Sequence, residues 1–223
     1  MTALPDAPAL PRIRGMTSEL SLEIAAVAAR MVVDEGMEYG PAKHRAAQTL
    51  GRRSSRAAEL PDNETLEDAV REHIALFCAD TQPAELAALR DVAALWMTRL
   101  ADFHPYLCGA VWRGTATRLS VVRLELYCDD SKAAEIALLN QQVEYRVGTV
   151  PGPRGRPVDV LVLDHFSRTL GDSVCIQLTV LDHDDVRGAL KPDTRGRSQR
   201  GDLAALQRLM QTPAPTGPEG NLS

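Results

Sequence analysis

The chain has 223 residues, of which 44% are hydrophobic and 25% are charged, and its formal net charge is −5. This composition is typical of a globular protein with a core of its own, and the acidic balance gives no overall attraction to nucleic acid or to an anionic membrane. No stretch approaches the ~18 consecutive apolar residues that a membrane span needs, so no membrane partner is expected.

The four cysteines, Cys78, Cys108, Cys128 and Cys175, lie far apart in the sequence. They form no Cys-x-x-Cys pair, which argues against a zinc knuckle or ribbon. Each has apolar neighbours, as buried free thiols usually have, and free thiols favour a cytoplasmic location.

The two ends of the chain are rich in proline and in small or polar residues. Residues 1–17 and 212–223 are therefore expected to be disordered. The N-terminus has no basic start followed by an apolar run, so no signal peptide is predicted. Between the ends, the pattern predicts a helical region over residues 18–104 and a mixed α/β region over residues 105–211.

The helical region shows apolar residues at helical spacing in four segments. Gly36 and Gly51 suit the ends of the first two helices, and Asp62 suits the N-cap of the third. The fourth helix carries Trp96 and Met97 on one packed face. The predicted helices cover residues 18–35, 41–51, 63–77 and 83–104.

The pattern changes after Pro105, where short strands alternate with helices. In the best of these strands Val122 and Leu124 face one side, and Arg123 and Glu125 face the other. The predicted strands cover residues 106–112, 120–128, 143–147, 158–163 and 174–181, and the predicted helices cover residues 131–141, 184–190 and 202–210. The fold class is therefore α+β, with an N-terminal helical region followed by a mixed sheet flanked by helices.

The segment from residue 109 to residue 126 contains Gly109-Ala110, then Gly114, and then Ser120-Val121-Val122-Arg123 on the best strand. This order resembles the active-site motif of the nucleotidyltransferase superfamily. That motif is a Gly-Ser pair, a loop with an inner glycine, and Ser-Asp-x-Asp on a strand. The later segment Pro157-Val158-Asp159 resembles the strand with the family's third carboxylate, which makes Asp159 the matching position.

The resemblance implies a nucleotidyltransferase-like sheet in which backbone amides of the Gly-Ser turn approach nucleotide phosphates. In the family, the paired aspartates hold divalent metals that activate the attacking group. Here Val121 and Arg123 stand in their places and Ala110 lacks the serine hydroxyl, so neither a metal site nor bound Mg²⁺ is expected. Arg123 instead favours a phosphate or a carboxylate. Glu125 shares its face and is expected to pair with it.

The expected activity is therefore binding of a nucleotide or other small anion in a regulatory role, with catalysis lost. Glu125 and Asp159 are the candidate catalytic carboxylates. The candidate ligand-binding residues are Gly109, Ala110, Arg113, Gly114, Thr115, Arg118, Ser120 and Arg123.

The residues leave three alternatives open. Basic residues gather in segments 43–56 and 187–200, which would suit a nucleic-acid-binding or toxin–antitoxin-type module. An active nucleotidyltransferase with an altered metal site is the second alternative. The third is an enzyme of another chemistry, for which His183 among its aspartates resembles a metal ligand, although aspartates at a strand-to-helix turn usually cap the helix. The sequence indicates no oligomeric state.

Overall fold

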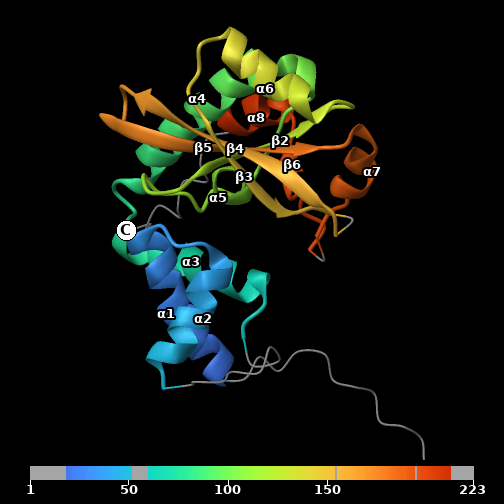
Figure 1. The fold of residues 1–223 in the computed structure, drawn as a ribbon. Helices are drawn as coiled ribbons and strands as arrows, with labels where there is room; N and C mark the ends of the chain where they lie inside the picture. Colours follow the sequence, from blue (N-terminus) through green and yellow to red (C-terminus); the bar gives the residue numbers. More distant parts are fainter. Residues whose placement is uncertain (1–18, 52–59, 154, 194, 212–223) are drawn as a thin grey trace, which may run out of the picture.

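The computed structural model describes residues 19–51, 60–153, 155–193 and 195–211. The ends that the sequence predicts to be disordered lie outside these residues, and so do Arg52, Arg53 and Arg56 of the first basic segment. The described residues form an α+β fold in which helices precede a mixed sheet, so the predicted fold class is confirmed (Figure 1).

The first three helices are α1 (Glu19–Glu35), α2 (Tyr39–Thr49) and α3 (Asn63–Phe77), and α1 packs against both of the others. The N-cap prediction is confirmed, because the Asp62 carboxylate accepts a hydrogen bond of 2.7 Å from the backbone N–H of Thr65. These helices share a core made largely of alanine and medium-sized side chains. Its buried residues are Ile24, Ala28, Ala29, Met31, Val33, Ala42, Ala46, Ala47, Leu66, Val70 and Ile74.

The fourth helix, α4 (Gln82–Arg99), packs with the sheet rather than with the three helices before it. Its buried residues Leu89, Trp96 and Met97 belong to the same hydrophobic cluster as the strands. The helical region predicted over residues 18–104 is therefore divided between two packing units. Helices α1–α3 form one unit, and α4 belongs to the other together with the sheet. A 3-10 turn (Ala101–Phe103) connects α4 to the first strand.

The sheet has six strands in the order β3-β4-β5-β2-β1-β6. Among the described strands, β2 and β5 pair in parallel and the other neighbours pair antiparallel. The strands are β1 (Tyr106–Cys108), β2 (Val122–Tyr127), β3 (Arg146–Pro151), β4 (Pro157–Ser167), β5 (Asp172–Leu181) and β6 (Arg200–Gly201).

The sheet lies between two helical layers (Figure 1). On one face it is covered by α4, by α6 (Ser131–Asn140) and by α8 (Leu203–Gln211), which bury Val122, Leu124 and Leu126 of β2. The short helix α5 (Gly109–Arg113) lies on the face toward α1–α3. The alternation predicted for β2 is thus confirmed, and its polar face is directed toward the first three helices.

The strand predicted over residues 106–112 ends at Cys108, and α5 begins at Gly109. Gly109 makes this turn with a φ of +73°, and a Cβ there would lie 3.3 Å from Cδ of Arg123. Both the backbone conformation and the close approach therefore favour glycine. Trp112 of α5 then packs against Gly201 of β6, where any Cβ would collide with the indole ring.

Three further elements differ from their predicted form. The strand predicted over residues 143–147 begins later and extends further, because β3 covers Arg146–Pro151. The helix predicted over residues 184–190 is a 3-10 turn (His183–Asp185) followed by α7 (Val186–Ala189). The two-residue strand β6 was not predicted, because so short a segment has no measurable alternation. Within the described residues, no helix is both long enough and apolar enough to cross a lipid bilayer.

Candidate functional site

A cavity of ≈ 400 Å³ lies between α1–α3 and the polar face of the sheet. Its wall includes three arginines, Arg113, Arg123 and Arg200, and two glutamates, Glu38 and Glu125. Its volume falls within the range typical of small-molecule sites. The cavity is therefore the main candidate for a functional site among the described residues.

Two of the arginines come from neighbouring positions across the sheet. Cys108 of β1 pairs with Arg123 of β2 on one side and with Arg200 of β6 on the other. Residues opposite each other in a sheet point to the same face, and two strand spacings separate the outer pair by about 10 Å. Arg123 and Arg200 therefore project into the same cavity on either side of Cys108.

Cys108 lies at the floor of the cavity but is poorly suited to act as a nucleophile. Burial, together with the nearby carboxylate of Glu125, raises the pKa of its thiol to about 12. Because the thiolate is the reactive form of cysteine, the thiol stays protonated and unreactive near neutral pH. Its Sγ lies 3.6 Å from the backbone carbonyl oxygen of Arg123, in keeping with a structural role.

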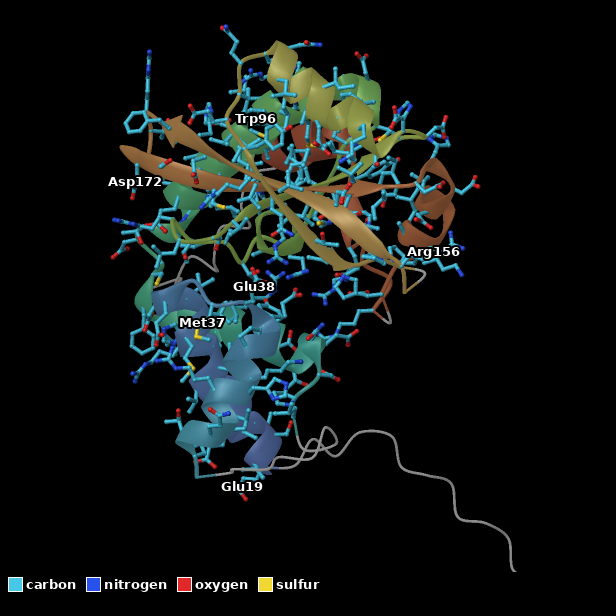
Figure 2. All side chains as sticks on the ribbon, in the orientation of Figure 1. Glu19, Met37, Glu38, Trp96, Arg156 and Asp172 are labelled. Atoms are coloured by element: carbon cyan, nitrogen blue, oxygen red, sulfur yellow. The ribbon has the colours of Figure 1, made fainter. Side chains whose placement is uncertain are left out.

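Arg123 forms an ion pair with Glu38, the residue that precedes α2. Figure 2 shows Glu38 at the end of the helical bundle that faces the sheet. The side chains of Arg123 and Glu38 are 34% and 49% exposed, respectively. The Arg123 side chain is thus partly open to solvent and already holds a carboxylate.

Arg200 forms an ion pair with Glu125, and Tyr127 completes this cluster. The Tyr127 hydroxyl donates a hydrogen bond of 2.8 Å to the Glu125 carboxylate. Burial acts to lower the pKa of Arg200, but Glu125 and Tyr127 outweigh it and the pKa is raised. Burial and the same carboxylate also raise the pKa of Tyr127. Arg200 is therefore a fixed cation, and the pairing predicted between Glu125 and Arg123 is wrong.

Arg113 extends into the cavity from the last turn of α5. It forms an ion pair with Glu67 of α3, which does not line the cavity. Its Nε lies 3.0 Å from the carboxylate of Glu67, whose side chain is only 6% exposed. Arg71 and Arg197 also contact this carboxylate, at 2.9 and 3.2 Å. Glu67 thus positions Arg113 and connects α3 to both α5 and the segment before β6.

The cavity brings together several residues that the sequence motif placed in the site. The predicted residues in its wall are Gly109, Ala110, Arg113, Ser120, Arg123 and Glu125. Ser120 is partly engaged, because its hydroxyl oxygen accepts a hydrogen bond of 3.0 Å from the backbone N–H of Thr117.

Three other candidates for ligand binding lie in the loop after α5 and do not line this cavity. Gly114 ends α5 with a φ of +80°, and Thr115 is buried. Arg118 lies 3.7 Å from Asp172 at the edge of a different cavity. Their positions in this loop are consistent with structural roles rather than with contact to a ligand in the cavity.

Asp159 does not share a cavity with Glu125. It lies on β4, which β5 separates from β2, and it has the same orientation as Leu161 in the core under α4 and α6. Its carboxylate lies 3.9 Å from Nζ of Lys132 on α6. The two candidate catalytic carboxylates therefore project from opposite faces of the sheet and cannot act on one bound group.

Other residues of the cavity were missed by sequence reasoning. Glu38 and Tyr39 come from the junction of α1 and α2, Asn63 comes from the start of α3, and Gln199 and Arg200 come from the end of the second basic segment. These residues are distant from the motif in sequence, and they have no periodicity that would mark them. Only the excess of arginine in residues 187–200 pointed to this part of the chain.

The histidine among aspartates has a local structural explanation. The carboxylate of Asp182 accepts a hydrogen bond of 2.9 Å from the backbone N–H of Asp184, which caps the 3-10 turn that contains His183. The His183 ring contacts that of His104 at a centroid distance of 5.6 Å. Among the residues that the structure describes, no three His, Cys, Asp or Glu side chains form a group able to hold a metal ion.

A comparison of the chain with protein-family models, with curated proteins and with solved structures finds no match.

Proposed function

We propose that this protein is a nucleotidyltransferase-like protein that has lost metal-dependent transfer and binds a nucleotide or another small anion in the arginine-lined cavity, in a regulatory role. The observation that carries the proposal is the convergence of Arg113, Arg123 and Arg200 on one cavity beside the Gly109 turn. Guanidinium groups bind phosphate and carboxylate oxygens in bidentate geometry. The cavity therefore offers several donors to one anionic group.

Active nucleotidyl transfer has less support than anion binding. The chemistry needs carboxylates grouped around the reacting phosphate, and Glu125 and Asp159 lie on opposite faces of the sheet. Glu125 is further engaged by Arg200 and Tyr127.

Binding of nucleic acid also has less support, because several of the basic residues described in the two segments pair within the chain. Lys43 donates a hydrogen bond of 3.0 Å to the backbone carbonyl of Pro61, and Arg45 lies 2.8 Å from Glu35. Arg195 contacts Asp68 at 2.7 Å. A nucleic-acid-binding surface would be supported by heparin retention that falls steeply with salt.

The proposal is tested by thermal unfolding with ATP, GTP or pyrophosphate, each with Mg²⁺ and with a chelator. At a ligand concentration of about 100 Kd, we expect the melting temperature to rise by about 5 to 10 °C without Mg²⁺. The substitution Arg123→Gln should remove most of this rise. The matched control Arg118→Gln should retain it, because Arg118 lies outside the cavity.

Two results would contradict the proposal. If none of these ligands shifts the melting temperature, anion binding at this cavity loses its support. If the shift requires Mg²⁺ and nucleoside monophosphate is released or transferred, the active-enzyme alternative is favoured instead.

A further inference from the structure

Glu38 occupies the N-cap position of α2 without capping the helix, since its side chain makes no hydrogen bond to the first turn. The carboxylate reaches instead across the cavity to Nη2 of Arg123 on β2. In this structure the partly exposed Arg123 side chain of the candidate site therefore already binds an anion, and that anion belongs to a different packing unit of the same chain.

Close contacts hold the junction that carries Glu38 against the loop that precedes β2. Gly36 has a φ of +68°, and a Cβ there would lie 3.0 Å from the backbone carbonyl oxygen of Leu119. The Thr117 hydroxyl donates a hydrogen bond of 3.5 Å to the backbone carbonyl of Val33. The junction can approach this closely only with glycine at position 36, so the placement of Glu38 near Arg123 is a property of the fold.

The two glutamates of the cavity differ in how firmly they are held. Glu125 is only 16% exposed, projects from the same sheet as its partner Arg200, and also accepts a hydrogen bond from Tyr127. Glu38 is 49% exposed and has Arg123 as its ion-pair partner across the gap between two packing units. An exposed pair of this kind contributes little net stability, so Glu38 is the carboxylate that a ligand can replace.

We propose that Glu38 is an internal competitor for the anion site, displaced from Arg123 when a ligand binds. This role rests on the proposed anion-binding function. A ligand must outcompete a carboxylate that is always present, which favours multiply charged anions of the diphosphate class over simple carboxylates. The apparent affinity is the intrinsic affinity multiplied by the fraction of molecules in which Arg123 is free of Glu38.

Displacement of Glu38 also has a structural consequence. The ion pair between Glu38 and Arg123 connects the junction of α1 and α2 to β2. A bound diphosphate that takes Arg123 breaks this connection and leaves the junction held by its contacts with the loop at residues 114–120 and by Arg113, whose guanidinium lies over the Tyr39 ring. Ligand binding at the sheet therefore loosens the attachment of the junction of α1 and α2 to β2.

The experiment is isothermal titration calorimetry with pyrophosphate and, separately, with acetate at fixed ionic strength. We expect Glu38→Gln to bind pyrophosphate about fivefold more tightly than the wild type, a change of about 1 kcal/mol, which is the upper end for an exposed ion pair. The matched control Glu35→Gln loses the same charge nearby, but Glu35 pairs with Arg45 outside the cavity. It should change the affinity by less than about twofold, since Glu35 is paired with Arg45, and an exposed charge outside the cavity is screened by salt. Acetate should bind the wild type far more weakly than pyrophosphate.

A second variant guards against misfolding of the first. Glu38→Asp keeps the charge but shortens the side chain, so it weakens the pair with Arg123 and should tighten pyrophosphate binding to an intermediate degree. Hydrogen exchange gives an independent readout. Pyrophosphate should accelerate exchange of the backbone amides at residues 37–39 in the wild type and leave it unchanged in Glu38→Gln.

The outcomes separate this proposal from the function on which it rests. If neither the wild type nor any Glu38 variant binds pyrophosphate, the anion site itself is overturned, and the competitor role with it. If the wild type binds and Arg123→Gln does not, but the Glu38 variants bind no more tightly than the wild type, only the competitor role is overturned. Equal tightening by Glu35→Gln would also overturn it, because the effect would then be general electrostatics.

Discussion

The two packing units of this protein use different side chains to fill their cores. The core of α1–α3 contains Ala28, Ala29, Ala42, Ala46 and Ala47, so these helices approach one another closely. The core between the sheet and its covering helices is filled mainly by larger side chains, above all leucine and valine together with Trp96, and alanine is a minority there. Where the units meet, the contacts are largely polar, and the candidate site lies in this polar zone. The difference teaches that the apolar residues of each core determine the packing of that unit. The polar residues between the two units are not needed to fill either core, so they can form a binding site.

Removal of the largest core side chain should produce the largest loss of stability. Trp96 is 2% exposed in the core between α4 and the sheet, on the side of the sheet away from the helical bundle (Figure 2). We expect Trp96→Ala to lower the free energy of unfolding by about 4 kcal/mol, since the substitution removes buried apolar surface and leaves a cavity. Urea denaturation measures this loss.

The neighbouring residue on the same helix provides the control for this prediction. Leu95 is 45% exposed, so Leu95→Ala should change the free energy of unfolding by less than about 0.5 kcal/mol. Equal effects at the two positions would contradict the assignment of α4 to the core of the sheet.

The bundle of α1–α3 should respond to the opposite change, an increase in side-chain size. Ala28 is fully buried where α1 packs against its neighbours. We expect Ala28→Leu to lower the free energy of unfolding by about 2 kcal/mol, because a close-packed site can admit the larger side chain only by moving the helices apart. Ala26 on the same helix is exposed, so Ala26→Leu is the matched control. A neutral result at Ala28 would show that the bundle is loosely packed.

The contrast between the cores also explains which parts of the fold the sequence predicts. Helices α1 and α3 were expected within one residue of their observed bounds, because each has an apolar stripe and a local end marker such as Gly36 or Asp62. The face of β2 was likewise predicted, since Val122 and Leu124 alternate with Arg123 and Glu125. These features depend on residues that are close together in sequence.

The features that sequence reasoning missed depend on contacts between distant residues. No pattern near Glu38 marks it as part of a site, and the excess of arginine in residues 187–200 does not single out Arg200, because the partners of both residues on β2 lie in another segment of the chain. The position of Asp159 under α6 follows from the order of strands in the sheet, which no local pattern fixes. The motif therefore predicted one wall of the cavity, and the helical bundle and β6 supplied the rest.

The smallest expected effect is at the N-cap of α3, the helix that carries Glu67 into the meeting zone. The pKa of Asp62 is lowered, chiefly because its carboxylate accepts a hydrogen bond from the backbone N–H of Thr65 and, second, because it is hydrogen-bonded to the Thr65 side chain. Unfolding removes these bonds and returns the carboxyl to its ordinary pKa of about 3.9. The contribution of Asp62 to stability is therefore complete above that value and is lost as the pH falls through the lower pKa of the folded state.

We accordingly expect Asp62→Ala to lower the free energy of unfolding by about 1 kcal/mol at pH 7. The difference between the wild type and this variant should shrink as the pH falls below about 4. Asp62→Asn keeps a cap oxygen without the charge, so its difference from Asp62→Ala should stay nearly constant over the same range. Urea denaturation of the three proteins at neutral and acidic pH measures both trends. An Asp62→Ala effect that is equally large in acid would mean that the cap oxygen stabilises α3 whether or not the carboxyl group is ionised, and that its charge adds nothing.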